Sequence, residues 1–550
     1  MIISKTTRYL VVPTNERADV TKLRLYDGER LLIDLDAKVD FASPESVMYY
    51  DLAPFMGLDV TVSHDSGKSF GFSEKLPAAY EPTRPRLHFT TQRGWINDPN
   101  GLVYYEGEWH LFYQHNPVGR GWGNMHWGHA KSTDLVHWQE LDEALYPDSL
   151  GDMFSGSAIV DYDNLLGLKE NEHDVLLLYY TAAGNGRELS AGQPFTQCMA
   201  YSTDGARSFK KYSGNPVVPH IKGSNRDPKV IRDPESGKYV MSLYLDGDEY
   251  ALLVSDNLVD WRQIQTISLP GDNECPDFYP LRDSDGSVKW VLTGAHDCCL
   301  IGSFDPEGGF RAETAPYKFG FGAVYAAQTF SIYERGDDGV PRVDLSRRLR
   351  LSWNRFTDMP SKYYNCELSV PCELTLKSGR LNILPAPEFE AEFEIVEDVR
   401  ELPTLGVVRT LPEVAMLTLE ISHIEEPIRL RIFGSHVTLD AASGRLNVGD
   451  ESMPLFVDDG RISLCIIADG CGLEIFNRNG SCFGAFRINR ADRLSADSLS
   501  ADSRSYSLAA DSLLADSLSA DSLSADNQLI IGGEGSLDHL VIAAGKDSVE

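Results

Sequence analysis

Residues 132–138 read Ser-Thr-Asp-Leu-Val-His-Trp, and the same order of elements occurs twice more along the chain. Residues 202–209 read Ser-Thr-Asp-Gly-Ala-Arg-Ser-Phe, and residues 255–261 read Ser-Asp-Asn-Leu-Val-Asp-Trp. In each copy a strand-like segment enters a tight polar turn, and an aromatic residue follows that would anchor the next strand. The copies lie roughly 50 to 70 residues apart, which is a propeller-blade period and not a sandwich spacing.

From about 86 to 375 the chain is all-β in texture and shows no long amphipathic helical pattern. At the observed period a region of this length holds about five blades. The alternative is a chance recurrence of ordinary hairpins, but the order of elements recurs and not only their composition. The sequence therefore predicts a five-bladed β-propeller over 86–375.

Both flanks of this region also read as strands. Residues 1–80 contain short apolar strands separated by Asp-Gly and proline turns, which predicts a small N-terminal β module that ends at a proline-rich connector. Residues 385–550 contain alternating strands such as 415–421, which predicts a C-terminal β-sandwich. A low-complexity insert at 491–526, built on Ala-Asp-Ser-Leu-Ser, interrupts it and is expected to be a solvated surface loop.

Composition excludes some classes of partner. A formal net charge of −32 argues against binding to nucleic acid or to an anionic membrane, and it fits a neutral partner. Nine irregularly spaced cysteines and the lack of an apolar core in residues 1–8 predict reduced thiols in a cytoplasmic protein. The most apolar run, 175–183, is too short to cross a bilayer. The oligomeric state stays open.

Residues 94–101, Gly-Trp-Ile-Asn-Asp-Pro-Asn-Gly, combine an indole ring, two amides and one carboxylate. Pro99 predicts a loop here, since proline interrupts strands and helices, and the flanking glycines permit unusual backbone angles. A carboxylate beside an indole and amides suits a sugar, because the ring can cover its apolar face and the amides can bind hydroxyls. The simpler interpretation of this segment alone is a surface turn.

Two further acids stand in similar settings. Asp227 lies in Asn-Arg-Asp-Pro-Lys (225–229), and Glu274 lies in Asn-Glu-Cys-Pro-Asp (273–277). Each acid taken singly is more simply a turn residue, given 82 acids in the chain. Retaining glycosidases need a nucleophilic carboxylate and a proton-donating carboxylic acid about 5 Å apart, and loops from different blades converge on the propeller axis. The three acids together, with Asp98, therefore predict a glycosidase site.

Aromatic and amide-rich segments at 112–117, 121–129 and 154–157 could supply a sugar-binding surface. Core packing is an equally good explanation for Trp127 and Trp138. Five histidines between 110 and 137 raise the possibility of zinc, but no pair has helical His-Glu-x-x-His spacing, and strand alternation would scatter them over both faces. We expect neither a metal nor another cofactor.

These segments together resemble glycoside hydrolase family 32, the β-fructosidases. The blocks at 95–101, 112–117, 127–130, 154–157, 226–228 and 274–276 match family blocks in the family's order. The resemblance is strong over about 86–375 and weak over the C-terminal region. It implies a five-bladed propeller followed by a β-sandwich.

The resemblance also implies roles for individual residues. Asp98 would be the nucleophile, Glu274 the general acid/base, and Asp227 the residue that holds fructose hydroxyls and stabilises the transition state. The terminal-fructose pocket would be lined by Asn97, Gln114, Trp122, Phe154, Ser155 and Arg226. The chain departs from the family pattern near Ala323, where an acid is usual, and at Cys372, where arginine is usual.

The function predicted in this way is a retaining glycosidase that releases terminal β-D-fructose from levan, inulin, fructo-oligosaccharides or sucrose. The segment around Trp122 is similar to that of the exo-acting inulinase and levanase branch. Alternatives are a sucrose-6-phosphate hydrolase, a propeller glycosidase acting on arabinose or xylose chains, and a catalytically inactive fructan-binding protein. Linkage preference, and hydrolysis against fructosyl transfer, stay open.

Overall fold

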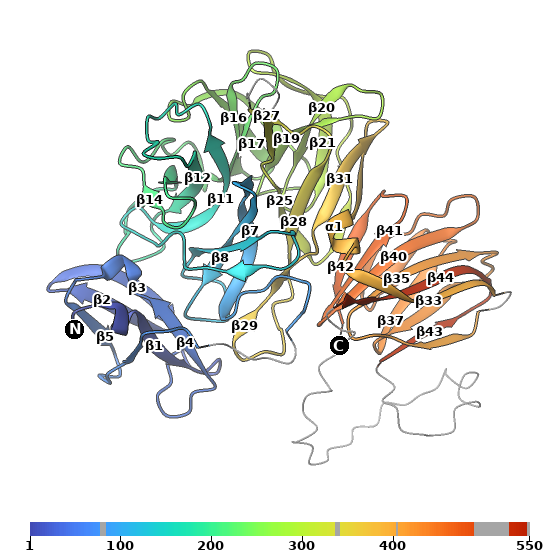
Figure 1. Cartoon of the computed structure of the whole chain (residues 1–550), viewed down its shortest axis with the longest axis horizontal. Helices are drawn as coiled ribbons and strands as arrows, with labels where there is room; N and C mark the ends of the chain where they lie inside the picture. The colour runs from blue at the N-terminus through green and yellow to red at the C-terminus, as the bar shows by residue number, and fades with distance from the viewer. Residues whose placement is uncertain (78–83, 336–340, 403–404, 489–526, 547–550) are drawn as a thin grey trace. The chain divides into compact units, whose positions relative to one another are not determined.

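A computed structural model of the chain describes residues 1–77, 84–335, 341–402, 405–488 and 527–546 (Figure 1). Nearly all regular elements in these ranges are β-strands, as the sequence predicts. The exceptions are two 3-10 helices, η1 (Lys5–Thr7) and η2 (Ala53–Phe55), and the single helical turn α1 (Pro387–Glu390). No helix within the described ranges is long and apolar enough to cross a membrane.

The described chain forms two compact units. The first contains Met1–Phe393 together with Glu474–Phe486, and the second contains Glu394–Leu473 with Arg487–Glu550. All nine cysteines are buried free thiols, as their irregular spacing predicts.

Five antiparallel sheets in the first unit are the blades of a propeller (Figure 1). Blade one consists of β7 (Gly94–Tyr105), β8 (Glu108–Asn116), β9 (His126–Ser132) and β10 (Gln139–Glu140). Blade two consists of β11 (Asp152–Asp161), β12 (Val175–Ala183), β13 (Thr196–Ser202) and β14 (Lys210–Lys211). Blade three consists of β15 (Arg226–Arg232), β16 (Tyr239–Asp246), β17 (Glu249–Ser255) and β18 (Arg262–Ser268).

Blade four consists of β19 (Asp277–Arg282), β20 (Val288–Thr293), β21 (Cys298–Asp305) and β22 (Gly309–Ala312), with β23 (Tyr317–Lys318) paired to β21. Blade five consists of β25 (Val324–Thr329), β28 (Arg348–Asn354), β31 (Cys372–Lys377) and β32 (Arg380–Pro385), with β30 (Glu367–Leu368) paired to β28. A separate hairpin joins β26 (Tyr333–Arg335) and β27 (Pro341–Val343).

The first strands of the blades surround the propeller axis. Strand β7 contacts β11, β11 contacts β15, β15 contacts β19, β19 contacts β25, and β25 contacts β7 again, so the ring is closed. Strand β29 (Tyr364–Asn365), which follows β28 of the last blade, pairs in parallel with the start of β7 and ties the two ends of the ring together. The predicted five-bladed propeller is confirmed.

The recurring turn of the sequence lies at the end of the third strand in blades one, two and three. The hydroxyls of Ser132, Ser202 and Ser255 accept hydrogen bonds from the amides of Leu135, Ala206 and Leu258. Each of these acceptor–donor pairs closes a turn whose last residue has a positive φ, of 72°, 59° and 71° respectively. A serine hydroxyl that binds the backbone a few residues on is a local turn signal, so the repeat marks blades.

Apolar packing between blades supplies the core. Strand β12, the apolar run that is too short to span a bilayer, lies in the middle of blade two with all nine residues buried. Its alternate side chains pack towards blade one, as Leu176 and Leu178 do, and towards blade three, as Leu177 does. Burying a leucine side chain contributes about 1.5–3 kcal/mol, so a strand buried on both faces stabilises two interfaces at once.

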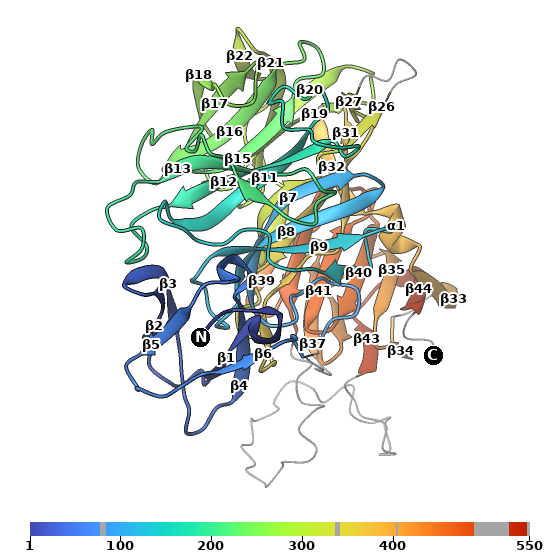
Figure 2. The same cartoon turned by 60° about the vertical axis from the view of Figure 1, so that its left-hand side comes forward.

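The N-terminal strands form two three-stranded sheets, with the orders β4-β1-β6 and β3-β2-β5 (blue in Figures 1 and 2). Their bounds are β1 (Tyr9–Thr14), β2 (Thr21–Asp27), β3 (Arg30–Ala37), β4 (Ser46–Asp51), β5 (Val60–His64) and β6 (Gly71–Ser73). Inward residues of both sheets, including Leu10, Leu25 and Ile33, share one core. Most of the predicted connector, 78–83, lies outside the described residues.

The second unit is a β-sandwich of two sheets. One sheet has the strand order β34-β43-β36-β37-β38-β39, and the other contains β40, β35, β44 and β33, each paired with the next. The bounds are β33 (Phe393–Leu402), β34 (Val407–Thr410), β35 (Ala415–Ser422), β36 (Ile428–Ile432), β37 (Ser435–Asp440), β38 (Arg445–Val448), β39 (Glu451–Pro454), β40 (Ile462–Asp469), β43 (Gln528–Gly532) and β44 (Ser536–Gly545).

The segment Glu474–Phe486, which belongs to the first unit, contains most of strands β41 (Gly472–Asn477) and β42 (Phe483–Arg487). Strand β42 pairs with β24 (Gly320–Gly322). The low-complexity insert at 491–526 lies outside the described residues.

Candidate active site

The three predicted acids meet because they lie at the beginning of innermost strands. Asp98 is in β7 and Asp227 is in β15, while Glu274 lies three residues before the start of β19. The expectation that Pro99 would end a strand is wrong, since β7 continues through it. The pairing of β7 with β8 shifts register between Ile96 and Pro99, which leaves Asn97 and Asp98 without ladder partners. Prolines within sheets are commonly found at such β-bulges.

Glycine is required at the end of this segment. Gly101 has a φ of +53°, and a Cβ built on it would lie 2.7 Å from a ring carbon of Phe112. A larger residue would be strained in its backbone and would also displace the Phe112 ring.

Hydrogen bonds orient the carboxylate of Asp98. Ser155 Oγ donates to Asp98 Oδ2 at 2.6 Å, and Asn97 Nδ2 donates to Oδ1 at 3.0 Å. Trp95 Nε1 donates to Asn97 Oδ1 at 2.8 Å and so fixes which way the amide faces. The Trp95 ring is only 5% exposed, so its role as a sugar-covering ring is not supported. It positions Asn97 instead.

Arg226 links the other two acids. Its Nη2 donates to Glu274 Oε1 at 2.6 Å, and its Nε lies 3.7 Å from Asp227 Oδ2. Tyr325, from blade five, donates its hydroxyl to Glu274 Oε2 at 2.8 Å. Both oxygens of Glu274 therefore have a donor, and Arg226 holds two carboxylates of the site at once.

Cys275 joins the three acids. Its amide donates to Asp227 Oδ2 at 3.0 Å, and its Sγ lies 3.5 Å from both Asp227 Oδ2 and Asp98 Oδ2. Asp227, Glu274 and Cys275 have φ values of +66°, +53° and +38°. Non-glycine residues seldom adopt this left-handed region, and such strained residues concentrate at functional sites.

Burial and mutual repulsion alter the ionisation of the acids. Burial raises the pKa of Asp227 to about 7, and the charges of Glu274 and Asp98 act in the same direction, whereas Arg226 opposes them. Burial also raises the pKa of Asp98 from its usual value, and the hydrogen bonds from Ser155 and Asn97 oppose that rise. Buried carboxyl groups whose pKa values are raised by their surroundings are typical of sites that carry out acid–base chemistry.

The remaining predicted residues take different positions. Gln114 is buried and donates to the carbonyl of Met153 at 2.8 Å, which places it against β11. Trp122 is 62% exposed, and its ring lies 5.8 Å from that of Phe154. Both rings line a cavity of about 500 Å³, and none of the three acids lines it.

Sequence reasoning did not assign Tyr325, Thr181 or the Cys275 backbone amide to the site. Thr181 Oγ1 accepts the amide hydrogen bond of Asp227 at 2.9 Å. Cys275 adjoins Glu274 and could have been included on that ground. No local pattern singles out Thr181 or Tyr325, because blade packing brings them to the acids.

A larger cavity of about 680 Å³ lies elsewhere, between the N-terminal module and blades one and two, and none of the three acids lines it. Two of the histidines that raised the question of zinc, His110 and His129, line it and are hydrogen-bonded to each other at 3.0 Å. Within the described residues no three metal-binding side chains are gathered. The cluster of acids stays the candidate active site, because the size of a cavity does not by itself indicate catalytic groups.

The fold and site define the class: a β-propeller with a carboxylate cluster of the glycosidase type at its axis. Residues 88–387 match the family model described as "Glycosyl hydrolases family 32 N-terminal domain". The chain therefore belongs to glycosyl hydrolase family 32, and the resemblance noted in the sequence is confirmed.

Relatives of known name support this membership. The chain is 33% identical to a levanase of Bacillus subtilis (strain 168) over 460 residues, which cover 73% of this chain and 65% of the levanase. It is 38% identical to an invertase of Schizosaccharomyces pombe over 251 residues, 42% of each chain. The chain thus spans two thirds or less of the length of these relatives.

Solved structures show the same fold. An exo-inulinase from Aspergillus awamori superimposes with a TM-score of 0.68 at 23% identity, over 84% of this chain and 98% of that one. Fructan 1-exohydrolase IIa from Cichorium intybus superimposes with a TM-score of 0.65 at 20% identity, over 85% and 98% of the two chains.

Proposed function

We propose that this protein is a retaining β-fructofuranosidase that releases terminal β-D-fructose from fructans or sucrose. The observation that carries the proposal is the cluster in which Asp98, Asp227 and Glu274 are held together by Arg226 and Cys275. Relatives named levanase, fructan beta-fructosidase, invertase and exo-inulinase support a fructose-containing substrate.

In the proposed reaction Asp98 attacks the anomeric carbon of the terminal fructosyl unit. Glu274 gives its proton to the glycosidic oxygen, so the bond from carbon to that oxygen breaks as the bond to Asp98 forms. Glu274 then takes a proton from water, whose oxygen attacks the anomeric carbon and releases fructose and the Asp98 carboxylate. Atoms and charges balance over the two steps.

The neighbouring residues have distinct tasks in this scheme. Ser155 and Asn97 hold Asp98 by one oxygen each, which orients the carboxylate for attack. Asp227 would accept hydrogen bonds from fructose hydroxyls and stabilise the positive charge that develops on the sugar ring. Arg226 would keep Glu274 and Asp227 at a fixed separation.

A phosphorylated substrate fits the site less well than a neutral one. Phosphate recognition needs cationic donors that are free to turn to the ligand. Arg226 is engaged with Glu274 and Asp227, and Arg187, the arginine in the adjacent cavity, is paired with Asp152. These pairings favour sucrose and fructans over sucrose 6-phosphate.

The test is fructose release from sucrose, inulin and levan by the purified protein and by an Asp98→Asn variant. We expect release by the parent protein and none by the variant, with equal thermal unfolding. Asp260→Asn, an exposed aspartate at a blade turn, is the matched control and should keep full activity. A folded parent protein that releases no fructose from any of the three, or an active Asp98→Asn variant, would overturn the proposal.

A further inference from the structure

The cavity of about 500 Å³ that Trp122 and Phe154 line has a wall that the propeller does not supply. Asp36, from β3 of the N-terminal module, lines it together with Trp122, Phe154, Arg187 and Phe195. The cavity meets the active site at β11, because Phe154 lines it and the next residue, Ser155, binds Asp98. None of the three acids lines the cavity itself, so a chain held at Asp98 would have to pass Phe154 to enter it.

One side of the cavity is aromatic. The rings of Trp122 and Phe154 lie 5.8 Å apart, and those of Phe154 and Phe195 lie 5.6 Å apart, each pair edge to face. An indole that is 62% exposed leaves a large apolar face in water, and sugar rings commonly cover such faces with their C–H groups.

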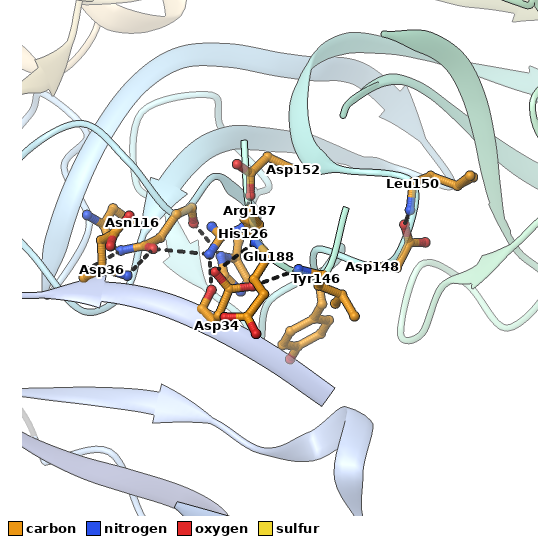
Figure 3. A network of polar contacts seen from close by, with 12 residues as sticks. Asp34, Asp36, Asn116, His126, Tyr146, Asp148, Leu150, Asp152, Arg187 and Glu188 are labelled. Carbon is orange, nitrogen blue, oxygen red and sulfur yellow. Dashed lines mark hydrogen bonds and ion pairs between the residues drawn. The ribbon is translucent and has the colours of Figure 1, made fainter. Parts of the chain in front are cut away.

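The module is fixed to this wall by backbone hydrogen bonds (Figure 3). The Asp36 amide donates to Asn124 Oδ1 at 2.9 Å, and Asn124 Nδ2 donates to the Asp36 carbonyl at 2.8 Å. Because both bonds use the backbone of Asp36, its carboxylate is left to line the cavity. That carboxylate is 48% exposed and has Lys22 Nζ at 2.9 Å.

The module also holds the loop 184–195, which supplies Asn185, Arg187, Gln193 and Phe195 to the cavity. Asp34, which is fully buried, accepts the amide hydrogen bonds of Glu188 at 3.2 Å and Leu189 at 3.1 Å. Arg187 donates to the Asp34 carbonyl and to the Asp152 carboxylate (Figure 3). A loop held at three consecutive residues presents its cavity-facing side chains in one arrangement.

From this arrangement we infer that the cavity is a subsite for the second and following sugar units of a fructan, and that the N-terminal module is a determinant of chain-length specificity. The inference rests on the proposed fructosidase function and names the part of the substrate that lies beyond the cleaved bond. The lining is suited to a neutral oligosaccharide: aromatic rings on one side, the amides of Asn185 and Gln193, and the Asp36 carboxylate as an acceptor for hydroxyls. Arg187 is neutralised by Asp152 and does not attract anions.

The experiment measures kcat/KM on sucrose and on a fructose-terminated tetrasaccharide for the parent protein, Asp36→Ala and Phe195→Ala. Water can replace part of a hydrogen bond lost at the Asp36 carboxylate, which is 48% exposed, so either that loss or the loss of a ring contact corresponds to roughly a fivefold to tenfold change. We therefore expect the tetrasaccharide-to-sucrose ratio of kcat/KM to fall about fivefold to tenfold in each variant. Asp19→Asn, an exposed aspartate of the same module outside the cavity, should leave the ratio unchanged.

A binding measurement separates this inference from the proposed function. The dissociation constant of the tetrasaccharide is measured by calorimetry in the Asp98→Asn background, with and without Asp36→Ala. If the parent protein shows no turnover but Asp36→Ala weakens binding about fivefold or more, the subsite stands and the proposed function fails. If turnover occurs, the ratio is unaffected by Asp36→Ala and by Phe195→Ala, and binding is unaffected by Asp36→Ala, the subsite is refuted. If the tetrasaccharide neither binds nor reacts, both are refuted.

Discussion

Replacing Ser155 by alanine tests the assignment of Asp98 as the nucleophile. Ser155 is 3% exposed, and its hydroxyl donates a hydrogen bond of 2.6 Å to the Asp98 carboxylate. This bond is shorter than the one from the Asn97 amide, which is 3.0 Å. Burial raises the pKa of Asp98, and the Ser155 hydrogen bond opposes that rise. Ser155→Ala is therefore expected to raise the pKa of the nucleophile further.

The size of the effect follows from the energy of the bond. A hydrogen bond to a charged group contributes about 1.5–3 kcal/mol, and one pKa unit corresponds to about 1.4 kcal/mol, so complete loss would give a rise of about 1 to 2 units. Asp98 is only half-buried, so water can replace part of the lost bond, and we expect a rise of about 1 unit.

The assay is the pH dependence of kcat/KM on sucrose. Because the nucleophile must be ionised in the free enzyme, its ionisation sets the acid limb of the profile, and that limb should move up by about 1 unit. Ser331→Ala is the matched control: Ser331 is a buried serine that donates to the Ala158 carbonyl at 2.9 Å. An acid limb at its parent position in Ser155→Ala, even with a lower plateau, would refute the assignment of this hydrogen bond to the reacting carboxylate.

Three further variants test other contacts. Asp227→Asn should raise the melting temperature relative to the parent protein at pH 8 but not at pH 3. Burial raises the pKa of folded Asp227 to about 7, so ionisation of Asp227 lowers the stability of the parent's folded state as pH rises from about 4 to 7. A difference in melting temperature that calorimetry shows to be independent of pH would contradict this prediction. Tyr325→Phe removes a donor to Glu274 and should lower kcat on sucrose about tenfold or more, measured in the steady state against an unchanged melting temperature. Trp122→Ala removes an exposed ring and should raise the KM for sucrose roughly fivefold, with little change in the melting temperature. An unchanged KM would exclude stacking of the Trp122 ring on the sugar.

The propeller could be predicted from sequence because its strongest signal is local. The turns that begin at Ser132, Ser202 and Ser255 depend on hydrogen bonds between residues three or four positions apart. Such local turns can be recognised from the sequence. Their spacing then gives the blade period, and the ring closure follows from the period and the length of the region.

The site was harder to predict where its contacts join distant blades. Tyr325 lies in blade five and reaches Glu274 in front of blade four, and Thr181 in blade two accepts a hydrogen bond from Asp227 in blade three. The Trp95 ring could not be distinguished from a sugar-binding ring by sequence, since its 5% exposure is set by the residues of other strands that pack around it.

The backbone of the innermost strands explains why these residues converge. The ladder of β7 shifts register beside Asp98, that of β11 between Phe154 and Gly156, that of β15 between Arg226 and Lys229, and that of β25 after Tyr325. A bulge leaves a residue without a ladder partner and bends the strand. Four inner strands therefore have unpaired residues near their first residues. Asp98, Ser155, Asp227 and Tyr325 lie in or beside these breaks, while Glu274 reaches the same place through its own left-handed backbone. In the two Asp-Pro pairs, which alone indicate ordinary turns, the aspartate falls within such a break, and this leaves Asp98 and Asp227 without ladder partners at the candidate site.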